Sequence, residues 1–546
     1  MAEQDNDLRF LIDLARGRFS RRDMLKASGA LGAGAALGGG LTIRQLADVS
    51  AQSPEAGAEP LGEVIWALDA PPPNLMPFGA IALAHWQGRE FFYDTLVMWD
   101  QNLNFVPGMA ETWEVDADGN YIFNLRQGVL FHNGNEMTAA DVKYSMDMAV
   151  APPEPGVAVS YLANITGTEI VDDYTVKVNM SQVDPTLPGT MAWGGYTPIV
   201  PANFYDDYNP LSEAIGTGPF KLVEYVQDDV IVMEANPDYW NPGSPCISKL
   251  TLKTLTEEQT RVAALRSGEI DGGTFSADVV ITLEGDDSIT ILEGAVSTPN
   301  VIQFQTAEAD VPWRDARVRQ AVNKVVDREL IRQNVFGGSA AITGAIPPGY
   351  GDYPLSEERL AELYANDVDA AKALMEEAGY ADGFDVELQA IAAPRSYTQN
   401  AEIVAEAVKQ LNINVSVVPL EIGTFADNIG TGAYQWGATG RGMRGDPSGY
   451  VIDFRQGTTH NVVWFGDGYN NEEFNELYDQ ALAETDQAAR VPMYQRLQEI
   501  IAEDAAHLYL VQPFKFQAVN NRLTGMYVFF GNTNPGLRAV CVADAE

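Results

Sequence analysis

Alternating apolar and polar positions predict β-strands at several separated places in the chain. The stretch "GEVIWALDAPPPN" at 62–74 predicts a strand that ends at Pro71, because proline has no N–H to donate to a neighbouring strand. In "ETWEVDADGNYIFNLRQG" at 111–128, alternating residues flank Asp118-Gly119, a dipeptide that tolerates the positive φ of a tight turn. We therefore expect a β-hairpin there, and a turn at "GTGPF" (216–220) that leads into a further strand.

Capping residues predict the ends of three helices. A threonine followed three positions later by an acidic or amide residue can cap a helix start, and glycine can end a helix because it adopts the left-handed conformation. These signals place helix starts after Thr138, with Asp141 reaching back to it, and after Thr256. They place helix ends at Gly268 and Gly379.

A β-α-β unit is predicted from residue 384 onward. Strand-like "FDVELQAIA" (384–392) and "INVSVVPL" (413–420) flank the helical stretch "YTQNAEIVAEAVKQLN" (397–412). Such a unit implies parallel pairing with a right-handed crossover. The chain is therefore expected to be of the mixed α/β class.

The first 51 residues differ from the rest of the chain. Residues 27–41 contain only Ala, Ser, Gly and Leu, a run too short and too weakly apolar to span a membrane. The preceding "SRRDMLK" resembles a twin-arginine (Tat) export signal, with Arg21 and Arg22 as its pair. We expect cleavage near Ala51. Lipid attachment is not expected there, because no cysteine lies near the end of the small-residue run. The alternative is a basic amphipathic start of a cytosolic helix.

Composition narrows the function of the protein. The whole chain of 546 residues is 46% apolar, enough for more than one core, and its formal net charge of -42 excludes a broad nucleic-acid surface. The two cysteines, Cys246 and Cys541, are too few for a disulfide framework. One long-range bridge and two unpaired thiols both remain open.

Motifs for enzymatic and metal chemistry are missing from the sequence. The four histidines lie far apart without H-E-x-x-H, and neither C-x-x-C nor G-x-S-x-G occurs. "GTGPF" lacks the Lys-Ser/Thr of a phosphate loop, and the Asp116-x-Asp118 pair lacks the Gly and Glu of a calcium loop. No cofactor and no metal are therefore expected.

Six blocks together resemble the family 5 extracellular solute-binding proteins, the dipeptide, oligopeptide and nickel-binding components of ABC importers. The blocks are "YDTLVMWDQNLNFVPGMAETWEVDADGNYIFNLRQGVLFHNGNEMTAADVKYSM" (93–146), "GTGPFKLVEYVQDDVIVMEANPDYW" (216–240), "RVAALRSGEIDGG" (261–273), "DVPWRDARVRQAVNKVVDRELI" (310–331), "AKALMEEAGY" (371–380) and "NNEEFNELYDQALAETDQAARVPMYQRLQEIIAED" (470–504). Their order and spacing cover nearly the whole mature chain.

The resemblance implies an α/β, periplasmic-binding-protein-like fold of two lobes that close on a ligand, with an extra domain inserted in the first lobe. The expected divisions are a Tat signal at 1–51, a linker at 52–60, lobe I at 61–98, 215–300 and 513–546, an inserted domain at 99–214, and lobe II at 301–512.

The function implied by the resemblance is capture of a small solute outside the cytoplasmic membrane and its delivery to an ABC permease. The expected protein is a monomer without enzymatic activity that meets the Tat translocase only during export. Peptide is the first expected ligand class and oligosaccharide the alternative, with a chelated metal or haem behind both. A Tat-exported cofactor enzyme is the alternative from another class.

Candidate ligand contacts are also carried over from the resemblance. Peptide-binding members place a carboxylate of a "D-P" loop against the ligand's amino group, and "GRGMRGDPSGY" (440–450) matches through Arg444, Asp446 and Pro447. Ser448 departs from the pattern, because an acidic residue is usual there. Asp446 could bind a ligand cation and Arg444 a carboxylate. Alternatively, Asp446 caps the turn and Arg444 is its surface partner.

Aromatic residues form the second set of candidates, since solute sites are mostly apolar clefts with few directed polar groups. Tyr434 and Trp436 lie upstream of the loop at strand alternation, which suggests that their rings share a face. His85 and Trp86 follow the proline-rich stretch, near the segment that lines the cleft in the family. Each of these rings could instead belong to the core.

Overall fold

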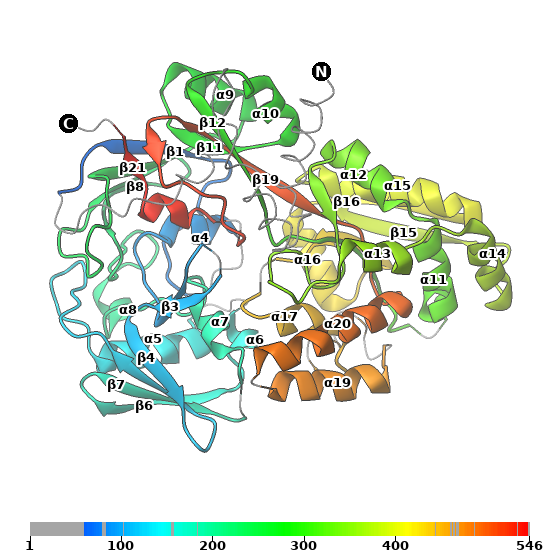
Figure 1. Cartoon of the computed structure of the whole chain (residues 1–546), viewed down its shortest axis with the longest axis horizontal. Coiled ribbons are helices and arrows are strands. Elements are labelled where there is room, and N and C mark those ends of the chain that lie inside the picture. The colour runs from blue at the N-terminus through cyan, green and yellow to red at the C-terminus, as the bar shows by residue number, and fades with distance from the viewer. Residues whose placement is uncertain are drawn as a thin grey trace, which may run out of the picture. The chain divides into compact units, whose positions relative to one another are not determined.

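Three β-sheets organise the chain in the computed structural model (Figure 1). The model describes residues 59–543 except 79–82, 102, 154–157, 183, 309, 443, 459–460, 462–464, 466–468, 485 and 532. The twin-arginine segment with Arg21 and Arg22, the expected cleavage position near Ala51 and most of the linker lie outside the described residues.

The first sheet has eight strands in the order β12-β19-β11-β1-β10-β9-β8, with β14 paired to β19 off that path. Only β1 pairs in parallel within it, with β10 and β11, and the other described ladders are antiparallel. Its strands are β1 (Glu63–Leu68), β8 (Phe220–Val226), β9 (Val230–Ala235), β10 (Lys249–Thr254), β11 (Gly272–Phe275), β12 (Ile289–Ala295), β14 (Ala340–Ile342) and β19 (Val511–Asn520).

The second sheet has five strands in the order β16-β15-β17-β13-β18. Strand β15 pairs in parallel with β16 and β17, as the β-α-β unit predicts, whereas β13 runs antiparallel to β17. Its strands are β13 (Asn300–Phe304), β15 (Phe384–Ile391), β16 (Ile413–Leu420), β17 (Trp436–Gly440) and β18 (Leu508–Tyr509). We call the part built on the first sheet the first lobe and the part built on the second sheet the second lobe. Strand β14 pairs with the first sheet but belongs to the second lobe, because Ala340 packs in its core.

The third sheet has four antiparallel strands in the order β4-β5-β7-β6. Its strands are β4 (Ala110–Val115), β5 (Tyr121–Leu125), β6 (Ile165–Asp172) and β7 (Thr175–Met180), and the small pairs are β2 (Val97–Trp99) with β3 (Phe105–Pro107) and β20 (Leu523–Thr524) with β21 (Cys541–Val542). The predicted hairpin is confirmed as β4 and β5, with Gly119 at φ 84° in the turn. The division of the chain into domains stays a prediction in its exact boundaries.

Helices surround the sheets. In the first lobe and third-sheet region they are α4 (Leu83–Arg89), α5 (Ala139–Val150), α6 (Ala158–Tyr161), α7 (Leu187–Ala192), α8 (Phe204–Asp207), α9 (Glu258–Ser267) and α10 (Ala277–Leu283). In the second lobe they are α11 (Ala316–Val325), α12 (Arg328–Phe336), α13 (Glu357–Leu363), α14 (Val368–Glu377), α15 (Ser396–Val408), α16 (Ile422–Thr431), α17 (Ser448–Val451), α19 (Glu472–Ala483) and α20 (Gln487–Glu503).

The predicted helix caps are confirmed at three of four ends. The N–H of Thr138 donates to the Asp141 carboxylate over 2.8 Å at the start of α5, and Gly268 and Gly379 adopt positive φ after α9 and α14. The start after Thr256 is wrong by one residue, since Glu257 is the cap residue of α9. A guanidinium N–H of Arg261 donates to the Thr256 carbonyl over 2.9 Å and holds that residue ahead of the helix.

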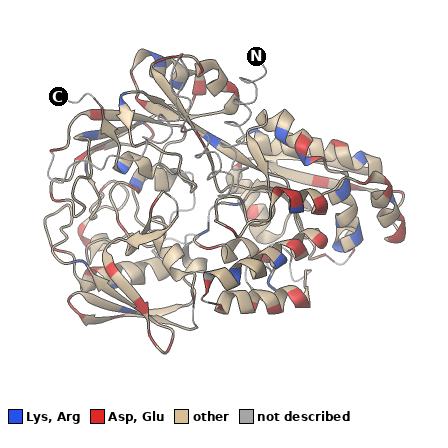
Figure 2. Ribbon diagram, viewed as in Figure 1, with Lys and Arg blue, Asp and Glu red and all other residues tan. Residues whose placement is uncertain are grey.

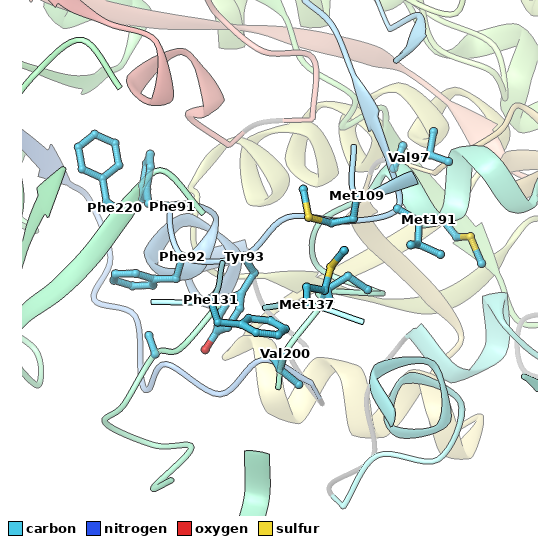
Figure 3. Close-up of a cluster of buried hydrophobic side chains, with 14 of the residues drawn as sticks. Phe91, Phe92, Tyr93, Val97, Met109, Phe131, Met137, Met191, Val200 and Phe220 are labelled. Carbon is cyan, nitrogen blue, oxygen red and sulfur yellow. The ribbon is translucent and has the colours of Figure 1, made fainter. Parts of the chain in front are cut away.

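One apolar core joins the third sheet to the first. Buried side chains of both sheets, such as Val64 and Phe123, belong to the same cluster, so the third-sheet region packs on the first lobe. Figure 3 shows part of this cluster, where Phe92, Tyr93 and Phe131 lie beside one another. The second lobe has separate clusters of its own around the second sheet and around α19 and α20.

The chain passes directly between the two lobes at residues 296–299, between β12 and β13, and at Leu510, between β18 and β19. The N–H of Leu510 donates to the carbonyl of Asn300 over 3.0 Å, which ties the two crossing segments together. Such short paired connections between lobes allow rotation of one lobe against the other.

The structure joins Cys246 and Cys541 in a disulfide across 295 residues of sequence, which decides between the two alternatives left open. Acidic side chains crowd the outer helices of the second lobe in Figure 2, for example at the starts of α13 and α19, where the helix dipole favours them. Among the described residues, no helix has the length and apolarity needed to cross a membrane.

Candidate functional site

The loop that follows β17 lies between the two lobes and is held at both ends by ion pairs. At its start, Arg441 pairs with Asp453, and both side chains are buried. The backbone N–H of Arg441 also donates over 3.0 Å to the carbonyl of Pro299, in the segment that crosses between the lobes. The loop is therefore fixed relative to that crossing segment.

Asp446 holds the other end of the loop. Its two oxygens accept from the guanidinium of Arg490 over 2.9 and 3.1 Å, and one of them also accepts from the N–H of Ser448 over 2.9 Å. The Asp446 side chain is 12% exposed and that of Arg490 is 4% exposed. The turn-capping alternative thus describes part of the role of Asp446, but its charged partner is Arg490 and not Arg444. Its contact with a ligand cation stays a prediction.

Arg444 extends from the same loop toward the first lobe. Its guanidinium carbon lies 5.2 Å from the centre of the Tyr161 ring, at the end of α6, which is a cation–π distance. Its Nε donates over 3.3 Å to the carbonyl of Gly449, and its backbone N–H donates over 3.3 Å to the Tyr350 hydroxyl. The side chain is half-buried and fixed in direction by these contacts.

A cluster of aromatic side chains from both lobes adjoins Arg444. The closest ring pairs are Trp86–Trp193 with centres 5.0 Å apart, Tyr350–Phe530 at 5.1 Å and Tyr161–Tyr196 at 5.4 Å. We call this set the aromatic cluster, and its members are Trp86, Trp99, Tyr161, Trp193, Tyr196, Tyr350, Phe529 and Phe530.

Polar atoms of the aromatic cluster supply hydrogen-bond donors. The indole N–H groups of Trp86 and Trp193 are buried and have no hydrogen-bond partner in the part of the chain that the structure describes. Burial raises the pKa of both Tyr196 and Tyr350, so their hydroxyls stay protonated and neutral at physiological pH. The Tyr350 hydroxyl already donates to the carbonyl of Arg444. The two unpartnered indole donors favour an acceptor-rich ligand, because an unpaired buried donor costs free energy.

The structure places the other predicted contacts as follows. Trp86 belongs to the aromatic cluster, and His85 lies beside it in sequence on α4, half-buried. Trp436 is fully buried in the core of the second lobe. Tyr434 precedes β17 and lines a pocket of about 310 Å³ together with Trp313 and Gln305. Trp436 and Tyr434 thus lie at the start of β17, whereas Arg444 follows its end.

The sequence did not predict a role for several residues of this region. Arg490 lies 44 positions from Asp446, and no local pattern links an arginine of a helix to a distant turn. Tyr161, Trp193 and Tyr196 lie in short helices and turns without periodicity, so only their residue type could have suggested a role. Among the described residues, no group of three or more His, Cys, Asp or Glu side chains is placed to bind a metal ion.

The chain is similar in sequence and in fold to known proteins. The model of a family described as bacterial extracellular solute-binding proteins, family 5 middle, matches residues 104–461. A model of the twin-arginine translocation signal sequence matches residues 18–38. The heme-binding protein A of Haemophilus influenzae is 27% identical over 455 residues, which are 77% of this chain and 81% of that protein.

Two further similar proteins are named for other ligands. The glutathione-binding protein GsiB of Pectobacterium atrosepticum is 25% identical over 451 residues, covering 80% of this chain and 86% of that protein. The solved structure of AgaA in complex with agropinic acid, from A. tumefaciens R10, has a TM-score of 0.76 and 26% identity, and covers 88% of this chain and 99% of that chain.

Proposed function

This chain belongs to the bacterial extracellular solute-binding proteins of family 5, and we propose that the solute it binds is a peptide held by its carboxylate between the two lobes. The protein has the two-lobed α/β fold of periplasmic binding proteins and serves an ABC importer. Its Tat signal directs it out of the cytoplasm. Members of the family bind substrates, and we extend this to a monomeric receptor without catalytic activity.

The observation that carries the proposal is the position of Arg444 beside the aromatic cluster. A guanidinium fixed by its own loop presents N–H donors in a planar fork that matches a carboxylate. The unpartnered indole N–H groups of Trp86 and Trp193 add donors nearby, among the described residues of the first lobe. Donors therefore dominate this surface, which favours an anionic end of a ligand.

The ion pair of Asp446 bears on which end of a peptide the protein recognises. Its charge is balanced by Arg490, so a ligand amino group would have to compete with a bidentate ion pair. We propose that the carboxyl terminus of the peptide provides the main charged contact, through Arg444. This differs from recognition of the amino group by a "D-P" carboxylate, and it agrees with the missing second acid at Ser448.

A thermal-shift assay with matched ligands tests the proposal. We would compare one pool of tripeptides in three forms, with free ends, with acetylated amino ends and with amidated carboxyl ends, together with maltotriose. A ligand that binds only the folded state raises the unfolding temperature, by an amount equivalent to about 2.7 kcal/mol at 100 times its Kd.

We expect stabilisation by the free and the acetylated pools and its loss with the amidated pool. Equal stabilisation by the amidated pool would contradict carboxylate recognition. Stabilisation by maltotriose alone would assign the receptor to oligosaccharides, and the aromatic cluster would then act by stacking on sugar rings.

A further inference from the structure

Two glycines bring the backbones of the two lobes into direct contact. Gly189 lies in α7, between Leu187 and Met191, which belong to the core of the first lobe, and Gly445 lies in the loop after β17 of the second lobe. A Cβ atom added to Gly189 would lie 2.0 Å from the carbonyl oxygen of Gly445. A Cβ atom added to Gly445 would lie 2.5 Å from the backbone nitrogen of Thr190.

These distances exclude a side chain at either position while the lobes keep this arrangement. Real Cβ atoms essentially never approach another heavy atom within 3.0 Å, and here the opposing atoms are backbone, which cannot rotate away. Neither glycine has a positive φ, so neither is needed for its own backbone conformation. The absence of a side chain therefore serves the approach of the two lobes.

The glycine contact lies next to the residues proposed to bind the solute. Gly445 separates Arg444 from Asp446 in sequence, so the position of the loop against α7 also sets the position of both side chains. Tyr161, over whose ring Arg444 lies, belongs to the first-lobe side of the same interface. Moving the loop away from α7 would thus separate Arg444 from Tyr161.

We propose that the contact between Gly189 and Gly445 sets how far the two lobes close, and thereby determines the affinity for the solute. A side chain at either position holds the lobes apart by the width of a methyl group or more. The inference rests on the proposed function, in which the solute is held between the lobes. Because the apparent Kd equals the intrinsic Kd divided by the fraction of closed molecules, a lower closed fraction weakens binding in proportion.

The experiment measures closure without any ligand, so its failure is distinguishable from a failure of the proposed function. Cysteines replace Tyr161 and Arg444, which approach each other across the interface, and a short bismaleimide cross-links them at a rate that follows the closed fraction. The two native cysteines are bonded to each other, so the engineered pair supplies the reactive thiols. Cross-linking is irreversible and therefore detects even a rarely populated closed state.

The rate is compared between four alanine variants built on this pair. Gly189→Ala and Gly445→Ala test the contact, while Gly194→Ala and Gly442→Ala are matched controls. The controls lie near the two test positions in sequence, and a Cβ atom on either would meet no heavy atom within 4 Å. We expect at least tenfold slower cross-linking for both test variants and rates within twofold of the parent for both controls.

Thermal unfolding of each variant separates closure from folding. Gly189 lies in a helix, where alanine by itself stabilises by about 0.5–1 kcal/mol, so slower closure without lower stability would support the proposal. Equal rates in test and control variants would overturn it. Failure of the parent pair to cross-link would also overturn it, because the contact between the lobes would then not form in solution.

Discussion

The two ends of strand β17 differ in what fixes them. At its start, Trp436 is fully buried, with ring centres of Phe304 and Trp313 at 5.2 and 6.0 Å. At its end, the loop is held by buried ion pairs, and Arg444 extends toward the other lobe. The comparison shows that packing fixes the strand itself, whereas charge pairs fix the loop that we propose to meet the ligand.

The largest expected effect concerns the start of the strand. Trp436→Ala removes a fully buried indole and leaves a cavity, so we expect a loss of about 3–5 kcal/mol in the free energy of unfolding. Binding of the stabilising tripeptide pool should stay within twofold of wild type, measured by calorimetry on folded protein. Trp436→Phe is the control and should lose less stability. A tenfold weaker affinity in that control would contradict the separation of the two ends.

The second effect concerns the ion pair at the end of the strand. Asp446→Ala leaves the Arg490 charge buried without its carboxylate, which should cost about 3 kcal/mol in chemical denaturation. The double variant Asp446→Ala/Arg490→Met should recover most of that loss, since both charges are removed. If Asp446 contacts the ligand directly, affinity will fall with the double variant even though stability returns.

Local sequence patterns were sufficient to predict helices and strands, but not to predict which residues pack around them. The β4–β5 hairpin and the β15-α15-β16 unit follow from turn residues and periodicity, because those signals act within about ten to thirty residues. Alternation suggested that Tyr434 and Trp436 share a face, but their rings belong to different apolar clusters, since Tyr434 packs with Phe425 and Ile429. Trp436 is covered by the core of the second lobe.

The candidate site was predictable only in part. The loop with Arg444 and Asp446 was identified by its resemblance to a family motif, and Trp86 by its place in the chain. The pairing of Asp446 with Arg490, however, depends on how α20 packs against the loop 44 residues earlier. Long-range packing of this kind leaves no mark in the sequence of either segment.

A third effect should change binding more than stability. Arg444→Gln removes the charged fork, the hydrogen bond of 3.3 Å to Gly449 and the cation–π contact with Tyr161, so we expect a loss of about 1–2 kcal/mol in the free energy of unfolding. Affinity for the free tripeptide pool should fall by roughly tenfold to a hundredfold, since hydrogen bonds to charged groups contribute about 1.5–3 kcal/mol. Arg444→Lys should restore part of it. Unchanged affinity in Arg444→Gln would remove this residue from the site.

The smallest effect is a pH dependence near the end of β17. Burial lowers the pKa of His507, and the positive charge of Arg441 lowers it further, so the ring is neutral in the folded protein. Its stack on Phe465, with ring centres 4.7 Å apart, and the bond from its Nδ1 to the Ala506 carbonyl over 2.9 Å keep it in place. Because an unfolded histidine titrates near 6.5, the stability contributed by the neutral ring is complete above that pH.

That contribution is lost as the pH falls, because the unfolded chain then binds a proton that the folded protein does not. Between pH 6.5 and 5.5 the loss should be about 1 kcal/mol in the free energy of unfolding. His507→Phe keeps an aromatic ring in the same stack and cannot titrate, so its stability should fall by about that much less over the same interval. Parallel pH profiles for the two proteins would contradict this prediction, because they would show that His507 binds its proton equally well in the folded and the unfolded chain.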